Sequence, residues 1–207
     1  MTDGGRSTRA AILAAARQLF AEEGYEGASV RAITGRAGAN VASVAYYFGS
    51  KEGLYLEVVM EILAPLANRI QEILAGGTSG SRRIQALLRA VFEHLWDNPD
   101  QAQLMVEIRL HRTHLLPELA EMLTPISTGL LQLVQEAQEE GVIREGHPLL
   151  FVMSLMSQPV YFMLITRRTP PGMLPANPHT LQGREFYLRH MIDFVQQGLA
   201  ISPREDA

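Results

Sequence analysis

The sequence predicts an all-α protein in which a small N-terminal helical domain is followed by a larger helical domain. Apolar residues recur at three- and four-residue intervals through successive segments of the 207-residue chain, which is the spacing of amphipathic helices. No segment shows the two-residue alternation of a half-buried strand, and no repeat with a period of about 20 to 50 residues is present. Hydrophobic residues make up 47% of the chain, so a substantial core can form.

The first predicted helix covers residues 8–23. Its apolar face consists of Ile12, Leu13, Ala16, Leu19 and Phe20. Gly24 is expected to end the helix, because glycine readily adopts the left-handed conformation found at helix C-termini. We expect the apolar face to pack against the two helices that follow. Arg6 and Arg9 can contact a phosphate backbone, although an exposed basic arm is more often only solvated.

Residues 29–54 contain the signals for two short helices, a tight turn between them and the start of a third helix. Ser29 can cap the first short helix, and Gly38 is expected to end it. Asn40 can then cap the second helix, which leaves a turn of about three to four residues, as a helix-turn-helix requires. Ser50 is expected to cap the helix that comes next.

The second short helix has one apolar face and one exposed face without charge. Val44 and Phe48 lie four residues apart and are expected to be buried. The opposite face carries Val41, Ala42, Ser43, Tyr46 and Tyr47. Two tyrosines and a serine without any charged residue are unusual for a solvated helix surface. They suit a helix that lies against a groove lined by phosphates.

The string AGANVASVAYYFGSKEGLY resembles the helix-turn-helix signature of the TetR family of one-component bacterial transcription regulators. That signature is approximately A-G-V-S-x-x-x-L-Y-x-H/Y-F-x-S-K-E-x-L after a T/S-V-x-x-I-A helix, and the match covers residues 29–55. Ala45 stands where many members carry tyrosine or asparagine, so a contact from that position is absent. Asn40 replaces the usual serine and keeps the capping chemistry. Within the family, GSKEGLY after NVASVAYYF is similar to the CecR-like branch.

The resemblance implies a ligand-responsive transcription regulator, most often a repressor that a small molecule releases from a palindromic operator in double-stranded DNA. It assigns residues 1–52 to a three-helix helix-turn-helix DNA-binding domain and residues 53–207 to a helical ligand-binding and dimerisation domain. The protein is then expected to be a cytoplasmic homodimer without enzymatic activity or cofactor. The alternative is a helical small-molecule sensor in which DNA reading is degenerate.

The DNA contacts are predicted to divide between base edges and phosphates. The assigned residues are Ser29, Arg31, Asn40, Val41, Ala42, Ser43, Tyr46, Tyr47 and Lys51. The first turn of the second short helix is expected to reach base edges, with Arg31 from the preceding helix. The two tyrosines and Lys51 suit phosphate oxygens, and Ser29 adds an anion site at a helix N-terminus. Alternatively, Tyr47 packs with Phe48 against the first helix.

The charge distribution agrees with a DNA-reading N-terminal domain on an acidic second domain. Residues 1–51 contain six Lys/Arg and four Asp/Glu, a net charge of +2. The remainder contains twelve against eighteen, a net charge of −6, although random scatter can produce so small an asymmetry. Cysteine is absent, so neither disulfides nor thiolate metal sites can form. The polar start, MTDGGRSTR, predicts a short arm and no secretory leader.

A long helix is predicted over residues 50–75, and Pro65 inside it should kink or split it. After a flexible GGTSGS segment at 76–81, further helices are predicted at 82–97, 100–113, 116–140, 148–168 and 183–200. The family resemblance assigns the last two to the dimer interface, where charged residues at Met191 and Phe194 are expected to give monomers.

The helix at 148–168 contains 18 residues, 149–166, without a formal charge, which is close to the shortest membrane span. Ser154, Gln158 and Pro159 interrupt this apolar segment. A helix that is apolar all round also suits a domain in which one face meets the core and the other meets a second subunit. We therefore expect no membrane insertion.

The resemblance also implies a pocket for a small-molecule effector in the second domain. Its candidate lining residues are Trp96, Met105, Ile108, Arg109, Arg112, Met153, Met156, Tyr161 and Phe162. Methionine and aromatic side chains suit an adaptable apolar pocket, but each of them is more often plain core. Arg109 and Arg112 interrupt an apolar helix and can either bind an anionic ligand or pair with Glu107 or Glu93.

Metal binding and catalysis find little support. His111 and His114 lie three residues apart with Glu107 one turn earlier, but a metal site needs a fourth group, and a polar helix face is the simpler interpretation. The sequence contains no G-x-S-x-G string, P-loop or dinucleotide fingerprint, and no facing pair of carboxylates is evident.

Overall fold

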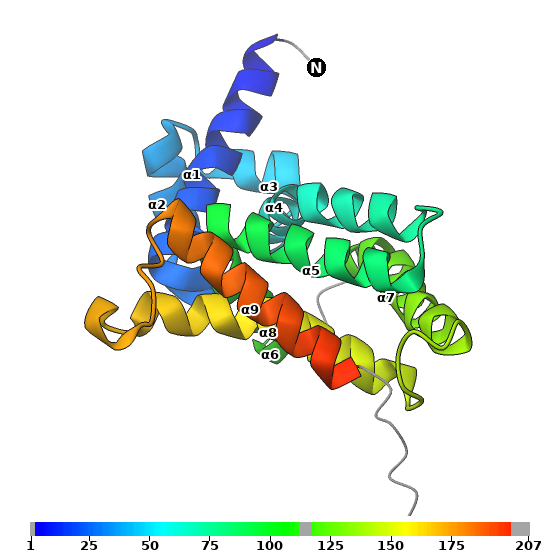
Figure 1. Ribbon diagram of the computed structural model, residues 1–207. Coiled ribbons are helices and arrows are strands. Elements are labelled where there is room, and N and C mark those ends of the chain that lie inside the picture. Colours follow the sequence, from blue (N-terminus) through cyan, green and yellow to red (C-terminus); the bar gives the residue numbers. More distant parts are fainter. Residues whose placement is uncertain (1–2, 112–116, 200–207) are drawn as a thin grey trace, which may run out of the picture. The chain divides into compact units, whose positions relative to one another are not determined.

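The computed structural model describes residues 3–111 and 117–199 of the chain (Figure 1). In these two segments the protein is helical and contains no strand. The helices are α1 (Asp3–Gly27), α2 (Val30–Ala37), α3 (Ala42–Phe48), α4 (Lys51–Leu74), α5 (Gly80–Asp97), α6 (Asp100–His111), α7 (Pro117–Glu139), α8 (Pro148–Arg168) and α9 (Leu181–Leu199), with a short 3-10 helix η1 (Pro171–Met173) before α9. The all-α class predicted from the apolar spacing is confirmed.

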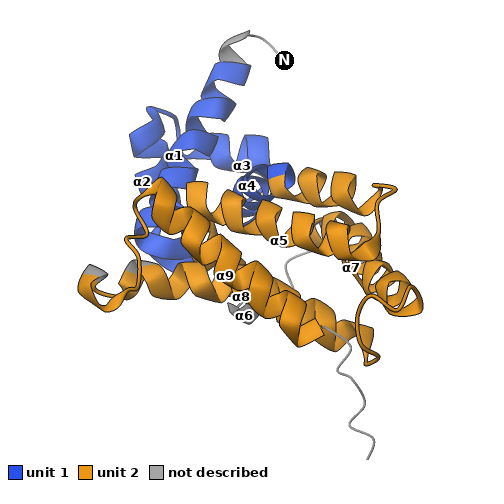
Figure 2. Ribbon diagram, viewed as in Figure 1, with its two compact units in different colours: residues 1–65 blue, residues 66–207 orange. Residues whose placement is uncertain are grey.

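The chain divides into two compact units at Pro65 (Figure 2). We call Met1–Pro65 the head and Leu66–Ala207 the body. α4 runs through the division as one helix, so of the kink or split that was predicted at Pro65 the split does not occur. The missing N–H of proline removes one hydrogen bond there, and the rest of the helix continues on both sides. The functional boundary predicted after residue 52 stays a prediction.

In the head, α1 is longer than the sequence predicted. Gly24 does not end it: this residue adopts φ 70° and ψ 176°, and helical structure resumes to Gly27. Positive φ is accessible to glycine without steric cost, so Gly24 can form a kink inside α1. The Tyr25 ring, which follows this kink, contacts Tyr55 and Lys51 of α4. The buried core of the head consists of Ile12, Ala15, Ala16, Leu19, Phe20, Ala28, Ile33, Val44, Phe48, Leu54, Tyr55, Val58, Val59 and Leu63.

In the body, α5 is the central helix and contacts α6, α7, α8 and α9 (Figure 1). Its large buried residues recur at three- and four-residue spacing, which is the pattern of an amphipathic helix: Ile84, Leu87, Leu88, Val91, Phe92 and Leu95. Phe92 is the largest of them, and its ring centroid lies 5.2 Å from that of Trp96 and 6.2 Å from that of Phe162. The body core is therefore built around the apolar face of α5.

An ion pair joins the start of α5 to α7 and to the end of α4. Nη2 of Arg83 donates to Oε2 of Glu136 at 2.6 Å, and Nη1 of Arg83 donates to the backbone carbonyl of Leu74 at 3.4 Å. Gln132 donates a second hydrogen bond to Glu136 at 2.9 Å. Hydrogen bonds from Arg83 and then Gln132 stabilise the charged carboxylate, which lowers the pKa of Glu136 below its ordinary value.

This lowered pKa makes the stability of the body depend on pH. Because the folded state binds the Glu136 proton less tightly than the unfolded chain, the stabilisation is present above the unfolded pKa and is lost as the pH falls through the folded pKa. We expect Glu136→Gln to lower the free energy of unfolding near pH 7, with a smaller loss near pH 3.5. Urea unfolding of both proteins at the two pH values measures this difference, and an equal loss at both would contradict it.

The long apolar helix α8 leaves much of its surface exposed. Its segment Pro148–Thr166 has a mean hydropathy of 1.7, and only 28% of that window is buried in the protomer. By length and composition alone it could cross a membrane, but core helices of soluble proteins pass the same test. The exposed large apolar residues of α8 are Leu149, Leu150, Met153, Tyr161 and Ile165.

Candidate nucleic-acid interface

The predicted caps form at both ends of α2. The Ser29 side-chain oxygen accepts a hydrogen bond from the backbone N–H of Ala32 at 3.1 Å. Gly38 adopts φ 63°, and its N–H returns to the carbonyl of Gly35 at 3.3 Å. The N–H of Ala39 bonds to the carbonyl of Thr34 at 2.9 Å. The left-handed glycine thus ends α2 and directs the chain into the turn.

The predicted Asn40 hydrogen bond forms just before α3, where Val41 already has helical angles (φ −54°, ψ −39°). Oδ1 of Asn40 accepts a hydrogen bond at 2.9 Å from the backbone N–H of Ala42, which lies two residues further along the chain. Val44 and Phe48 are the buried residues of α3. α1, α2 and α3 contact one another, so the buried side of α3 packs inside the head and its opposite side remains outside.

The outer face of α3 carries the predicted uncharged residues. Val41, Ala42 and Tyr46 are exposed, and the exposed fraction of Tyr46 is 79% against 48% for Val41. Ser43 and Tyr47 are half-buried. The Tyr47 ring meets the Tyr46 ring edge-on at 4.8 Å and the Phe48 ring at 6.3 Å. The Tyr47 ring therefore packs against both Tyr46 and Phe48, and Tyr47 remains partly exposed to solvent.

Basic side chains near α3 differ in what they contact. Nζ of Lys51 lies 4.3 Å from the centroid of the Tyr25 ring, a cation–π contact between α4 and α1. Arg36 pairs with Glu22 at 2.9 Å. Arg31 is exposed on α2, and none of the ion pairs found among the described side chains involves it. Sequence reasoning missed the role of Tyr25, because the kink at Gly24 that positions its ring could not be foreseen.

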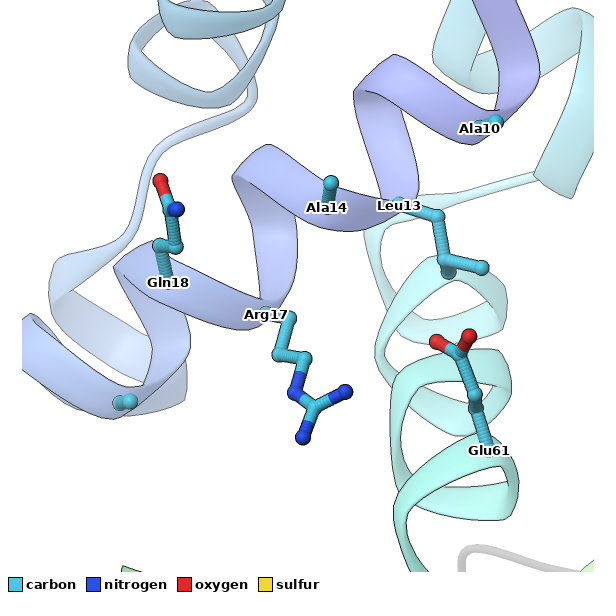
Figure 3. A pocket seen from close by; sticks show the side chains of 7 residues that line it. Ala10, Leu13, Ala14, Arg17, Gln18 and Glu61 are labelled. Atoms are coloured by element: carbon cyan, nitrogen blue, oxygen red, sulfur yellow. The ribbon is translucent and has the colours of Figure 1, made fainter.

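The head also contains a hollow of about 440 Å³ between α1 and α4 (Figure 3). It is lined by Ala10, Leu13, Ala14, Arg17, Gln18, Ala21 and Glu61. Small alanine side chains on α1 leave the space, and Figure 3 shows Arg17 on α1 and Glu61 on α4 beside it. No residue predicted to bind DNA or an effector lines this hollow.

The predicted effector residues fall into three groups. Trp96, Met105, Met156 and Phe162 are half-buried against the body core. Met153 and Tyr161 lie on the surface of α8 and are 59% and 66% exposed, and their assignment to the effector pocket stays a prediction. Both faces of α8 are apolar, and periodicity could not tell which one meets the core. The described part of the structure does not include the side chains of Ile108, Arg109 and His111, or any part of Arg112 and His114.

Trp96 and Phe162 of the half-buried group belong to an aromatic cluster with Tyr187. The Phe162 ring lies 4.8 Å from the Tyr187 ring, and the Trp96 ring lies 6.4 Å from it. The hydroxyl of Tyr187 donates to the carbonyl of Ala176 at 2.6 Å. The sequence analysis did not predict this cluster, because its members come from three different helices. Among the residues that the structure describes, no group of three His, Asp or Glu could hold a metal ion.

Two family models match this chain. One describes bacterial regulatory proteins of the tetR family and matches residues 12–58, which include the whole helix-turn-helix. The other describes a tetracyclin repressor-like C-terminal domain and matches residues 81–195. The chain belongs to the TetR family. TetR-family proteins are ligand-responsive DNA-binding regulators and not enzymes; they bind operators and small-molecule effectors and act as dimers.

Named relatives and solved TetR-family structures agree with this assignment. The chain is 24% identical to the transcriptional repressor NicS of Pseudomonas putida over 196 residues, which cover 93% of this chain and 92% of NicS. It is 46% identical to the dual regulator CecR of Shigella flexneri over 56 residues, 27% of this chain and 25% of CecR. The crystal structure of HlyIIR, a hemolysin II transcriptional regulator, matches 96% of this chain and 99% of its own at a TM-score of 0.69 and 22% identity. PfmR of Thermus thermophilus matches 92% of this chain and 99% of its own at a TM-score of 0.66 and 22% identity.

Proposed function

We propose that this TetR-family protein is a homodimeric cytoplasmic repressor that reads a palindromic operator through α2 and α3 of each protomer. A small-molecule effector releases it from the DNA. The observation that carries this proposal is the exposed, uncharged face of α3 on a helix whose opposite face is buried in the head. Support also comes from NicS, which is named a transcriptional repressor and aligns over nearly the whole chain.

Base reading is assigned to the first turn of α3 and to Arg31. Val41 and Ala42 present apolar groups that suit thymine methyls, and the Ser43 hydroxyl can bond to several bases. Arg31 is exposed on α2, where its guanidinium can donate two hydrogen bonds to the edge of one guanine. Helix-turn-helix proteins read base edges mainly from the N-terminal part of the recognition helix. The cap at Asn40 holds that part in place.

Phosphate contacts are assigned to Ser29, Tyr46, Tyr47 and Lys51. Ser29 begins α2, where free backbone N–H groups and the helix dipole attract an anion. The Lys51 ammonium rests on the Tyr25 ring, which restricts its motion but leaves N–H donors for phosphate oxygens. The hydroxyl of Tyr46 stands on the exposed face of α3.

We expect Lys51→Ala and Arg31→Ala to weaken DNA binding in different ways. Lys51→Ala should lower affinity for all duplexes alike and reduce the slope of log K against log salt by about 0.9 for each protomer. Arg31→Ala should instead cost about 1–3 kcal/mol at particular base pairs of the operator. The duplex is one that the wild-type protein selects from a randomised pool, compared with a scrambled sequence at several salt concentrations.

Arg36→Ala is the matched control, because Arg36 lies on the same helix as Arg31 and is already paired with Glu22. It should leave base preference unchanged. If Lys51→Ala alters base preference and leaves the salt slope untouched, this division of roles is wrong. A wild-type protein that selects no duplex would instead favour a small-molecule sensor with degenerate DNA reading.

The dimer is proposed to form through α8 and α9. These helices expose the apolar side chains Leu149, Leu150, Met153, Tyr161, Ile165, Leu181, Phe186 and Phe194. Large exposed apolar patches are typical of subunit interfaces. In a two-fold dimer each of these residues is buried twice, once in each protomer.

The effector pocket is proposed to include the half-buried residues Trp96, Met105, Met156 and Phe162. Ile108, Arg109 and Arg112 remain candidates from the sequence. α4 is the helix that runs from the head into the body, so we propose that it carries the effect of ligand binding to α3. By linkage, DNA must weaken effector binding by the same factor by which the effector weakens DNA binding.

A further inference from the structure

Arg9 makes two contacts that join three helices of the head. Its guanidinium carbon lies 5.0 Å from the centroid of the Phe48 ring, and Phe48 is the last residue of α3. Its Nη2 donates a hydrogen bond to Oε2 of Glu57 on α4. Because Arg9 itself lies on α1, a single side chain links α1, α3 and α4.

The two contacts use different parts of the guanidinium. The flat face of this group can cover an aromatic ring while N–H groups at its edge donate to a carboxylate. Both contacts therefore form at once, which the compact ammonium of lysine does not reproduce. The side chains of Arg9 and Glu57 are only 35% and 36% exposed, and partial removal from water strengthens both contacts.

α3 depends on such contacts because it is short. It has seven residues, and isolated helices shorter than about 12 residues are not stable in water. Val44 and Phe48 are the buried residues of this helix, so whatever holds these two side chains sets the direction of the outer face. Phe48 lies at the C-terminal end, where Arg9 covers its ring.

We infer that Arg9 is a positioning residue for DNA reading: it holds the outer face of α3 in its reading orientation through Phe48 and Glu57. This inference rests on the proposed function, in which α3 reads base edges. It differs from the phosphate contact that a basic residue near the start of the chain suggests. Both the face and one edge of the Arg9 guanidinium are already engaged inside the head.

Glu57 separates the two roles by the sign of its effect. If Arg9 bound phosphate, the Glu57 carboxylate would compete with DNA for it, and Glu57→Gln would tighten binding. If Arg9 positions α3, Glu57→Gln removes a contact that holds the guanidinium on Phe48 and weakens specific binding, although it removes a negative charge. The salt slope separates the roles a second time, since a lost phosphate contact lowers it.

The experiment compares Arg9→Gln, Arg9→Lys and Glu57→Gln in the full-length protein. Arg17→Gln is the matched control, because it removes the same charge from an exposed position on α1. Affinities are measured for the duplex selected by the wild-type protein and for a scrambled duplex at several salt concentrations. Circular dichroism shows the temperature range in which each variant is folded, and binding is compared only in that range.

The expected result is a loss of discrimination without a loss of salt slope. All three variants lower the ratio of affinities for selected and scrambled DNA, by about 2- to 30-fold for Arg9→Gln, the range of one cation–π contact. The slope for Arg9→Gln equals that for Arg17→Gln. Arg9→Lys does not restore discrimination, because the charge alone does not hold Phe48. If Arg9→Gln does not fold, Arg9→Lys and Glu57→Gln carry the same test.

Two results overturn the inference. One is a slope for Arg9→Gln that lies about 0.9 per protomer below the control, with Arg9→Lys restoring binding and Glu57→Gln tightening it; Arg9 is then a phosphate contact. The other is an unchanged affinity ratio in every variant. Failure of the proposed function looks different, because the wild-type protein would then select no duplex at all.

Discussion

Replacing Tyr55 with alanine is expected to abolish specific DNA binding while the body stays folded. Tyr55 is 2% exposed, and its ring meets those of Phe20 and Tyr25 edge-on at 5.0 and 4.9 Å. Removal of a large buried ring costs about 3–5 kcal/mol. A compact unit the size of the head, Met1–Pro65, buries a small core and has little stability in excess of that loss. The recognition helix would then lose the frame that orients it.

Trp96 fluorescence and circular dichroism, taken together, distinguish unfolding of the head from unfolding of the body. Trp96 is the only tryptophan of the chain and lies on α5 in the body, so its fluorescence follows unfolding of the body. Far-ultraviolet circular dichroism follows the helices of both units, and a gel shift on the selected duplex reports DNA binding. Loss of DNA binding with an unchanged Trp96 transition is the expected combination.

Tyr55→Phe is the matched control, since it keeps the ring contacts with Phe20 and Tyr25 and removes only the hydroxyl. It should cost about 1 kcal/mol and retain most of the specific affinity. Full DNA binding by Tyr55→Ala would show that the aromatic cluster does not hold the head together. If the stability of the body, measured from the Trp96 transition, falls by as much as the stability of the head, the two units unfold as one.

Charged residues in place of Ile165 and Phe194 are expected to give a folded monomer with very weak DNA binding. Ile165 lies on α8 and Phe194 on α9, and the latter is 58% exposed in the protomer. Burial of a charge at a two-fold interface is unfavourable in both copies, so the dimer should dissociate. A monomer engages one half-site at a time, and loss of joint binding lowers apparent affinity by about 100- to 10,000-fold. Sedimentation velocity and a gel shift measure the two effects.

Met191→Glu provides the contrast and corrects an expectation drawn from the sequence. Met191 shares the apolar stripe of α9 with Phe194, but it is 3% exposed and belongs to the body core. A charge there should unfold the body instead of separating folded protomers. A dimeric Ile165→Arg, Phe194→Glu double variant at micromolar concentration would rule out α8 and α9 as the interface.

The helix-turn-helix could be predicted from the sequence because its signals are local. The Ser29 cap, the left-handed Gly38 and the Asn40 cap each act on backbone groups within four residues. Burial of Val44 and Phe48 followed from a spacing of four residues in a helix. The long string of matched residues then identified the family, which the models over residues 12–58 and 81–195 confirm.

Contacts between residues far apart in the chain were decided only by the tertiary structure. Gly24 turns α1 without ending it, and this places the Tyr25 ring under Lys51, 26 positions later. The pairing of Arg9 with Glu57 across 48 positions has no local signature, because any exposed arginine on α1 has the same propensity and spacing. Such pairs depend on how helices pack, and helix packing depends on the whole core.

The sequence by itself determined that α8 and α9 are apolar helices, but the tertiary structure decided which of their faces belongs to the protomer. Met191 and Phe194 lie three residues apart on α9 and share its hydrophobic stripe, yet the first is buried and the second is exposed. The hydrophobic effect has no direction, so a side chain that meets the core and one that meets a second subunit have the same pattern in the sequence. Only the position of the neighbouring helices separates them.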